Sequence, residues 1–216
     1  MRDLVFVWFL KALRAVDRVR LRLRMARQPG LEIHPDASSN FAAARYSLAP
    51  GARLRIGAGA VTERIPGALH FDLRPGARVE IGAGTWLRTE AGPVHVVAFD
   101  GAIVDVGPDC FLNSAYISAK REVSLGRRTN IGLGSRVFDS DQHDLDAEHP
   151  EVTERVRIGS FVWIAADVTV LRGVTIGDHS VVASRSLVNR DIEEHTFAAG
   201  LPATPRGPVG DRTHAR

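Results

Sequence analysis

The 216-residue sequence contains a single cysteine, Cys110. One cysteine cannot form a disulfide within the chain, and it excludes a zinc site built from several cysteines. No run of apolar residues approaches the roughly 20 that a membrane-spanning helix needs. The 20 glycines and 11 prolines are too few for a collagen-like or low-complexity chain. These absences favour a globular protein of ordinary polarity that can bury one sizeable core.

Positive charge is concentrated at one end of the chain. Residues 1–28 contain eight lysines or arginines and two aspartates, a net charge of +6, although the whole chain carries only +3. The rest of the chain is therefore slightly acidic, at −3. A nucleic-acid-binding surface needs clustered positive charge, so the main body is not expected to bind DNA or RNA.

Residues 1–30 are predicted to form a basic amphipathic helix that ends at Pro29-Gly30. Apolar residues recur at steps of three and four, and basic residues follow another side of the helix. The apolar positions are Phe9, Leu13, Val16, Val19 and Leu23, and the basic positions are Lys11, Arg14, Arg18 and Arg22. A signal peptide is not favoured, because the apolar stretch 4–10 is short and no small-residue cleavage site follows it.

Two roles fit such a helix. It could cap the end of the domain or pack on a partner subunit. It could also lie in the interface of an anionic membrane, with its arginines among the headgroups and Trp8 and Phe9 inserted. The first role predicts a cytoplasmic protein, and the second predicts a peripheral protein at the inner face of the membrane.

From residue 50 onward the sequence repeats itself. PGARLRIGAG begins at Pro50, PGARVEIGAG begins 25 residues later at Pro75, and DGAIVDVGPD begins after a further 25 at Asp100. In the C-terminal half the period shortens to six, with aliphatic residues at one phase and small or β-branched residues four positions later. The aliphatic positions are Ile158, Ile164, Val170, Ile176, Val182 and Val188, and the others are Val162, Val168, Val174, Ser180 and Ser186.

A period of six fits neither an amphipathic helix nor a simple alternating strand. It fits a short strand followed by a tight corner, repeated so that each aliphatic side chain points into one axial core. Successive coils then stack as parallel strands about 4.8 Å apart. Cys110 stands four residues after Val106, in the slot for small residues. We therefore expect this cysteine to pack in the core rather than to act as a nucleophile.

The sequence resembles the hexapeptide-repeat acyltransferases, most specifically between Asn113 and Ala203. The segments IGSFVWIAADVTVLRGVTIGDHSVVASRSLVNRDI and AAGLPATP carry this resemblance. It implies an all-β fold, a left-handed parallel β-helix with three hexapeptides in each coil, preceded here by the N-terminal α-helix. The expected divisions are the helix at 1–30, the acyltransferase domain at 31–204 with an active-site loop at 138–157, and a C-terminal tail at 205–216.

Within this family the sequence is most similar to the sugar O-acetyltransferases of the maltose, galactoside and surface-polysaccharide type. The resemblance implies transfer of an acetyl group from acetyl-CoA to a hydroxyl of a sugar, or of a surface-polysaccharide or glycolipid precursor. It also implies a homotrimer with active sites between adjacent subunits, and direct transfer without a covalent enzyme intermediate. A sugar-nucleotide N-acyltransferase and a non-catalytic scaffold of the same fold are the alternatives.

The six-residue phase breaks at residues 138–155, FDSDQHDLDAEHPEVTER. Insertions in a solenoid lie at its surface, often on the functional face. His143 lies in this break, and an imidazole can accept a hydroxyl proton at neutral pH. The motif DSDQH matches the place of the family's catalytic histidine, so the resemblance assigns the general base to His143. Asp141 either orients His143 or stabilises a turn.

Two further residues are candidates for binding the acceptor. Asn113, in CFLNSAYISA, resembles a family asparagine that faces the acceptor. A buried asparagine can also close a coil through hydrogen bonds to the backbone, so both readings stay open. Asp139, which flanks His143, is the second candidate.

The sequence contains neither a P-loop nor a G-x-G-x-x-G motif for the phosphates of CoA. The resemblance instead places the pantetheine arm between subunits beside the last coils. There Trp163 would line the groove, and the small Ala165 and Ala183 would let the pantetheine amides reach the backbone. Arg190 and Arg206 are the candidates for binding the CoA phosphates.

The chain departs from the family's pattern beside these residues. The family usually has Gly-Ala-Asn where this chain has Ala165-Ala166-Asp167, and many members have a small residue where Arg185 stands. These departures concern the CoA site more than the fold.

No metal site is expected. A γ-class carbonic anhydrase shares the fold but needs three histidines that converge on zinc. Here His143 and His149 are six residues apart and His95 lies far upstream.

Overall fold

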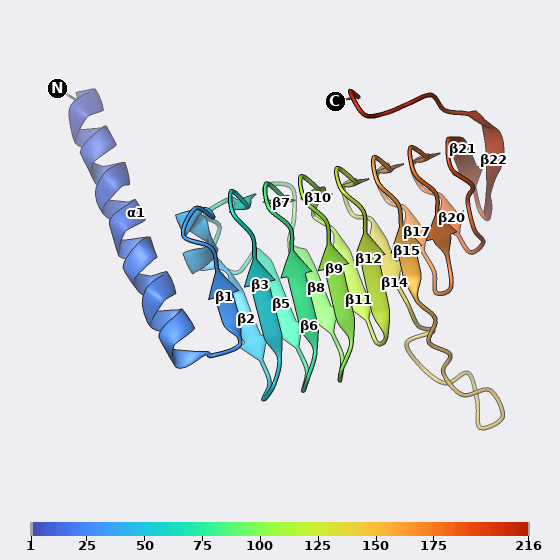
Figure 1. The fold of residues 1–216 in the computed structure, drawn as a ribbon, viewed down its shortest axis with the longest axis horizontal. Coiled ribbons are helices and arrows are strands. Elements are labelled where there is room, and N and C mark those ends of the chain that lie inside the picture. Colours follow the sequence, from blue (N-terminus) through green and yellow to red (C-terminus); the bar gives the residue numbers. More distant parts are fainter. Residues whose placement is uncertain (1, 216) are drawn as a thin grey trace.

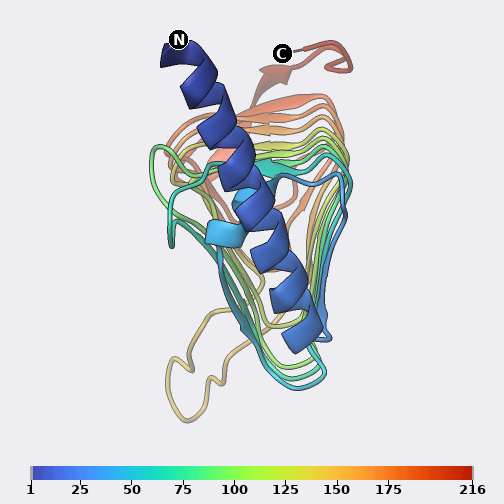
Figure 2. The ribbon, with the colours of Figure 1, turned by 90° about the vertical axis from the view of Figure 1, so that its left-hand side faces the viewer.

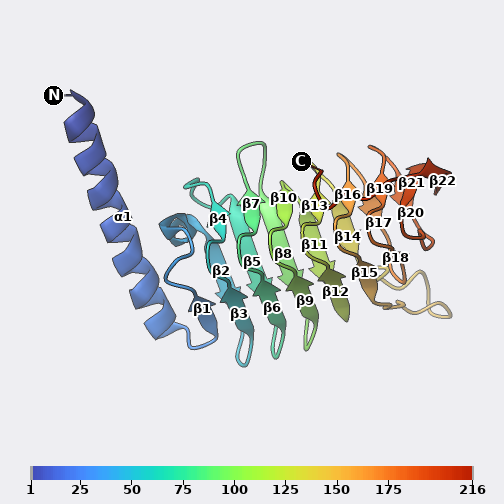
Figure 3. The ribbon, with the colours of Figure 1, turned by 45° about the horizontal axis from the view of Figure 1, so that its top comes forward.

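The computed structural model describes residues 2–215 and contains three sheets of short parallel strands around a common core (Figures 1 and 3). Sheet A contains β1 (Leu31–Ile33), β3 (Arg53–Ile56), β6 (Arg78–Ile81), β9 (Ile103–Val106), β12 (Glu122–Leu125), β15 (Val156–Ile158) and β18 (Thr175–Ile176). Sheet B contains β2 (Arg45–Leu48), β5 (Leu69–Leu73), β8 (Val94–Ala98), β11 (Tyr116–Ala119), β14 (Arg136–Phe138), β17 (Thr169–Val170) and β20 (Leu187–Val188). Sheet C contains β4 (Val61–Thr62), β7 (Trp86–Arg88), β10 (Phe111–Asn113), β13 (Asn130–Ile131), β16 (Trp163–Ile164), β19 (Val181–Val182), β21 (Thr196–Gly200) and β22 (Ala203–Pro208).

From β3 onward the chain visits sheets A, C and B in turn. Each coil therefore adds one strand to each sheet, and strands pair in parallel with those one coil away. The antiparallel pair β21 and β22 ends the stack in the described chain. Viewed along the stack, the coils outline a triangle (Figure 2). The predicted arrangement of repeated strands and corners around one axis is confirmed.

The repeats of the sequence are single coils, but the coils have two lengths. Arg53 pairs with Arg78 and Arg78 with Ile103, so each 25-residue repeat is one coil. Nearer the C-terminus Arg157 pairs with Thr175, 18 residues later, which equals three six-residue repeats. The expected three hexapeptides per coil therefore apply to the C-terminal coils, whereas the N-terminal coils are longer and have strands of four or five residues in sheets A and B.

The predicted core phase is confirmed. All six aliphatic positions of the short repeat are buried, and so are the five small or β-branched positions that follow them. Cys110 is also buried, and burial raises the pKa of its thiol to about 11. The thiol is therefore protonated at neutral pH and packs as a small apolar side chain.

The helix α1 (Arg2–Arg27) lies across the N-terminal end of the stack (Figure 2). It packs on β1 and on the 3₁₀ helix η1 (Ser39–Ala43), which takes the place of a sheet C strand in the first coil. Leu21 is buried in the core, and the buried carboxylate of Asp17 accepts hydrogen bonds from Arg64 Nε at 2.6 Å and Nη2 at 3.2 Å. One side of the helix therefore caps the coils. Within residues 2–215 no helix is both long and apolar enough to cross a membrane.

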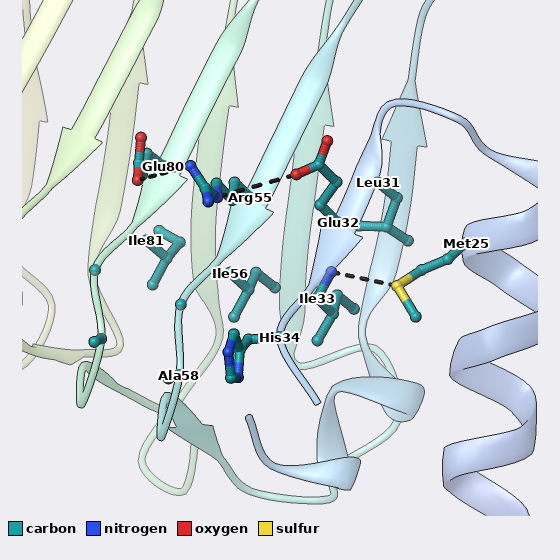
Figure 4. Close-up of a pocket in the computed structure, with 13 residues that line it drawn as sticks. Met25, Leu31, Glu32, Ile33, His34, Arg55, Ile56, Ala58, Glu80 and Ile81 are labelled. Atoms are coloured by element: carbon teal, nitrogen blue, oxygen red, sulfur yellow. Dashed lines mark hydrogen bonds and ion pairs between the residues drawn. The ribbon is translucent and has the colours of Figure 1, made fainter. Parts of the chain in front are cut away.

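A cavity of about 520 Å³ lies where α1 meets the first coils (Figure 4). Arg55 lies between Glu32 and Glu80, at 4.0 Å and 3.9 Å from their carboxylates. These exposed charges neutralise one another, and the cavity lies at the opposite end of the stack from the residues predicted to perform chemistry. We therefore look for the functional site elsewhere.

Candidate active site

The sequence-predicted site residues lie along two opposite edges of sheet B. Where sheet B turns into sheet A, the chain carries Asp139, Asp141, His143 and, further along the stack, Arg190; we call this corner the histidine edge. On the other side, sheet C and its turn into sheet B carry a second group, which we call the tryptophan edge. Its members are Asn113, Trp163, Ala165, Ala183 and Arg206.

The loop of the histidine edge begins at Asp139, which is buried. Its Oδ1 accepts a hydrogen bond from the backbone N–H of Lys120, and its Oδ2 accepts from those of Arg121 and Glu122, each at 2.7 Å. These three amides form the corner of the preceding coil. Asp139 therefore ties the start of the loop to its neighbour, and its carboxylate points into the fold rather than to the surface.

Asp141 is held by an arginine of the next coil. Its Oδ1 accepts from Arg172 Nε at 2.6 Å, and its Oδ2 accepts from the Val152 amide at 3.3 Å. The hydrogen bond from Arg172 is the main reason that the pKa of Asp141 is lowered. Arg172 Nη1 also donates to Glu154 Oε2 at 2.6 Å, so one guanidinium fastens both sides of the loop. Asp141 thus pairs with Arg172 rather than with His143 within the described chain.

A lysine of the preceding coil fastens the loop from the other side. Lys120 Nζ donates to the Gln142 carbonyl at 3.1 Å and to Glu151 Oε2 at 2.7 Å. Gln142 has a φ of 71°, a left-handed conformation that costs free energy in a residue other than glycine. His143 follows this constrained residue directly and its side chain is exposed. The imidazole is therefore presented to solvent from a fixed point.

Beyond His143 the loop projects from the stack (Figures 1 and 3). Its tip is a turn closed by Asp146, which accepts hydrogen bonds from the Glu148 and His149 amides at 2.9 Å each and contacts His149 Nδ1 at 2.8 Å. Leu145, in this tip, is 82% exposed. An apolar side chain so exposed on a projecting loop indicates a surface that another molecule can cover.

A second cavity, of about 340 Å³, lies at the base of this loop. Its lining residues are Phe138, Ser140, Asp141, Gln142, Leu171, Arg172 and Asn189. Arg190 follows Asn189 and is exposed at the same corner. The histidine edge therefore combines an exposed imidazole with a small, polar-walled cavity.

The tryptophan edge has a different surface. Trp163 in β16 is 45% exposed and faces outward from sheet C, with the Arg212 guanidinium 5.6 Å from its ring. Beside it on the next strand lies Val181, which is buried. Arg206, on the edge strand β22, is exposed. A planar ring with an open face can pack along an extended, partly apolar chain.

Small residues follow Trp163 where sheet C turns into sheet B. Ala165 and Ala183 are half-buried and lie on successive coils, since the Ala165 amide donates to Val182 and the Ala183 amide to Ala198, at 3.0 Å and 2.9 Å. At Gly132, one coil earlier, a Cβ would lie 2.5 Å from the Ala165 carbonyl carbon, so only glycine fits there. The backbone is therefore close to the surface along this corner.

The two departures from the family's pattern also lie at this corner. Asp167 and Arg185 both have positive φ, 57° and 59°, and Arg185 Nε lies 4.0 Å from Asp167 Oδ2. Both side chains are exposed, so their pairing adds little to stability. They place one charge of each sign next to the two alanines.

Asn113 ends β10 on the same side of sheet B. Its Oδ1 is buried and has no hydrogen-bond partner in the described chain. The interpretation that Asn113 closes a coil through this oxygen is therefore not what the chain shows. A buried acceptor without a donor costs free energy, and a bound hydroxyl group could supply the donor.

The two edges do not meet within one chain. They are separated by the width of sheet B, about 15–20 Å for five residues of extended chain. Sequence reasoning placed His143 and Trp163 in one site, and it missed Lys120, Arg172 and Glu154, which hold the loop. The one available signal was coil register: Lys120 follows β11 as Asp139 follows β14, so both stand at the same corner.

The residue chemistry narrows what this arrangement can do. Cys110 is buried and protonated, so it is not an available nucleophile. Among residues 2–215 no group of three or more histidine, cysteine, aspartate or glutamate side chains is placed to hold a metal ion. His143 therefore offers acid–base chemistry on a bound substrate.

Comparison with known proteins supports the same class of chemistry. Residues 155–190 match the family model for the bacterial transferase hexapeptide (six repeats). The chain is 37% identical to galactoside O-acetyltransferase of Escherichia coli K12 over 70 residues, which cover 32% of this chain and 34% of that protein. It is 32% identical to galactoside O-acetyltransferase of Lactococcus lactis subsp. lactis IL1403 over 106 residues, covering 44% and 51%. The matches thus span about a third to a half of these relatives.

A solved structure with a similar fold is that of the polySia-specific acetyltransferase NeuO. Its TM-score is 0.60 at 20% identity, covering 88% of this chain and 85% of that one. At this identity the likeness concerns the fold alone. The expected resemblance to hexapeptide-repeat transferases is confirmed by the family match and by the relatives.

Proposed function

We propose that this protein transfers an acetyl group from acetyl-CoA to a hydroxyl group of a sugar, or of a surface-polysaccharide or glycolipid precursor. The observation that carries this proposal is His143, an exposed imidazole at a point of the loop held by Lys120 on one side and Arg172 on the other. The likeness to galactoside O-acetyltransferases supports a sugar acceptor. The left-handed turn of the coils, which the family resemblance implies, belongs to the same proposal.

In this proposal the site lies between copies of the chain. The histidine edge and the tryptophan edge lie on opposite sides of sheet B, so a second copy has to bring its tryptophan edge to the first copy's His143. The contact joins two different surfaces, and repeating it around a three-fold axis closes a homotrimer with three identical sites. The exposed Leu145 on the projecting loop supplies apolar surface for that contact.

The reaction proceeds without an enzyme-bound intermediate. His143 accepts the proton of the acceptor hydroxyl as its oxygen attacks the thioester carbonyl carbon. A backbone N–H stabilises the negative charge on the carbonyl oxygen. The C–S bond then breaks, the ester remains on the sugar, and the protonated His143 returns its proton to the CoA sulfur.

The other residues bind and position the substrates. The ring of Trp163 packs along the pantetheine arm, and Ala165 and Ala183 let the pantetheine amides hydrogen-bond to the backbone. Arg190 and Arg206 are exposed and bind the CoA phosphates. The buried Asn113 Oδ1 accepts a hydrogen bond from an acceptor hydroxyl.

The two aspartates beside His143 act through the loop in this proposal. Asp139 holds the start of the loop by its three backbone hydrogen bonds. Asp141 holds the loop through Arg172. Both are therefore positioning residues rather than groups that touch the substrate.

The test is an assay of CoA release and of acetylated product with acetyl-CoA and a panel of neutral sugars, amino sugars and oligosaccharides. His143→Ala should lower kcat/KM by about 10²–10⁴-fold, because the hydroxyl loses its base. Acetylation of an amino sugar alone would replace the O-acetyltransferase proposal by N-acetyl transfer. The absence of any product would favour the scaffold interpretation.

His149 provides a matched control, because it is an exposed histidine of the same loop whose ring contacts Asp146 rather than the base of the loop. His149→Ala should keep activity within about twofold of the wild type, since the Asp146 turn retains its two backbone hydrogen bonds. Equal losses in both variants would show that the loop, and not the His143 imidazole, is what the reaction requires.

A further inference from the structure

The N-terminal helix α1 has two apolar sides, and only one of them packs on the coils. Leu21 is buried on the packed side. On the other side apolar residues recur at helical steps and are exposed, from 66% at Trp8 to 48% at Val16. This outer stripe contains Trp8, Phe9, Val16, Val19 and Leu23.

The packed side fixes which way the outer stripe points. The Asp17 carboxylate accepts two hydrogen bonds from Arg64, and Arg24 Nη1 donates to the Ala44 carbonyl at 2.9 Å. The Ile33 amide donates to Met25 Sδ at 3.3 Å (Figure 4). Rotating the helix to bury the outer stripe would break these contacts and expose Leu21. The stripe therefore faces away from the coils, at one end of the molecule (Figure 2).

Basic residues border the outer stripe on both sides. Helical spacing places Lys11, Arg18 and Arg22 along one border and Arg20 and Arg27 along the other. Asp17, the acidic residue in the middle of the helix, is buried and paired with Arg64. The exposed surface of α1 is thus an apolar strip between rows of positive charge.

This combination selects one kind of partner. A second copy of α1 laid on the same stripe would bring rows of like charge together, which is unfavourable. An anionic bilayer instead attracts the arginines to its headgroups and accepts Trp8 and Phe9 below them. We propose that α1 docks this protein on an anionic lipid surface through the outer stripe.

The proposal is compatible with a free active-site loop. The loop of His143 precedes β15, five steps along sheet A from β1. At about 4.8 Å per step the loop lies roughly 24 Å from the end that α1 covers. A bilayer at α1 therefore leaves the histidine edge accessible, and docking does not depend on the proposed acetyl transfer.

The test measures binding of the full chain to vesicles of phosphatidylcholine with 30% phosphatidylserine, and to vesicles of phosphatidylcholine alone. We expect at least about tenfold tighter binding to the anionic vesicles, weakened by added salt because the attraction is electrostatic. Binding should shift the fluorescence of Trp8 to the blue, a change that Trp8→Phe removes while binding remains. Equal binding to both vesicles, or none to the anionic ones, would overturn the proposal.

Two triple variants separate the outer stripe from general surface hydrophobicity. Val16→Ser with Val19→Ser and Leu23→Ser removes the stripe at exposed positions and should weaken vesicle binding at least about tenfold. Val61→Ser with Ile65→Ser and Ile103→Ser changes three similarly exposed apolar residues away from the stripe and should leave binding unchanged. Circular dichroism and the thermal midpoint establish that both variants fold. If the stripe variant changed the mass in sedimentation but not vesicle binding, the stripe would be a contact between copies and the lipid proposal would be wrong.

Discussion

The histidine edge and the tryptophan edge are built from the same solenoid by different means. The tryptophan edge uses in-phase positions of the repeat, where small residues such as Ala165 and Ala183 bring the backbone near the surface. The histidine edge interrupts the repeat, and its loop is held by charged residues of the preceding and following coils, Lys120 and Arg172. A repeat can thus supply a flat binding surface by itself, whereas a fixed catalytic side chain needs contacts from outside its own coil.

The sharpest test of the comparison asks whether the two edges work across copies. His143→Ala and Ala183→Trp should each lower activity at least about 100-fold, the first by removing the base and the second by filling the tryptophan edge. Co-expressed in equal amounts, the two variants should recover about a quarter of wild-type activity, because one contact in four then pairs two intact edges. The assay is CoA release by the mixed oligomer. A mixture as inactive as its parts, although mixed oligomers form, would show that each copy builds its own site.

The next prediction concerns the contacts that hold the loop. Lys120→Met and Arg172→Met should each lower kcat about tenfold, since His143 loses its fixed position. The KM for acetyl-CoA should stay the same, because the tryptophan edge is untouched. Arg155→Met is the matched control: this arginine pairs with Glu122 at 2.9 Å, at the end of the loop, and its loss should change kcat less than twofold. A rise in KM without a fall in kcat would mean that the loop binds substrate instead of placing the base.

Asp139 should matter for stability as well as for the loop. Asp139→Asn replaces one carboxylate oxygen by an NH₂ group facing the amides of residues 120–122, and we expect a loss of about 1–3 kcal/mol in the free energy of unfolding. Urea unfolding measures it. The exposed Asp146→Asn serves for comparison and should cost under about 0.5 kcal/mol. Equal losses would contradict a special role for the buried carboxylate.

Acid should open the histidine edge first. The hydrogen bond from Arg172 holds the pKa of Asp141 below its ordinary value, so this contact stabilises the loop above about pH 3.9 and is lost as the pH falls through the lower, folded-state pKa. Cleavage of the loop by pepsin should therefore increase as the pH falls below about 4. Arg172→Met should be cleaved readily already at pH 4. Cleavage of the variant only at the same pH as the wild type would show that the pair does not hold the loop.

The smallest effect concerns Cys110. Because burial raises the pKa of its thiol to about 11, alkylation by iodoacetamide at pH 7.5 should be at least about tenfold slower in the folded protein than in urea. Mass spectrometry follows the modification. Rapid alkylation of the folded chain would reopen the case for a nucleophilic cysteine.

Much of the fold could be predicted because a solenoid writes its geometry locally. The aliphatic phase from Ile158 to Val188 predicted buried positions, and all of them are buried. The same phase did not predict that the N-terminal coils would be 25 residues long and the C-terminal ones 18, although the repeat at Pro50 and Pro75 carried the longer period. Coil length depends on how each corner is closed, which a single register of aliphatic residues does not specify.

The candidate site was only partly predictable. His143 stood out because it interrupts the phase, but the partner of Asp141 is Arg172, 31 residues away, and this pairing follows from stacking. Likewise the unpaired Oδ1 of Asn113 depends on burial by neighbouring coils. Contacts between coils join residues whose separation varies with every insertion, so sequence spacing does not reveal them.

The sequence by itself determined the repeated strand and corner, the buried phase, and the loop that carries His143, because each depends on residues within one or two turns of the repeat. The tertiary structure alone decided that the two edges lie on opposite sides of sheet B, that Lys120 and Arg172 hold the loop, and that α1 turns an apolar stripe outward. The physical reason is that these features arise from stacking. Only the folded chain brings residues of different coils, or the helix and the first coil, to within contact distance.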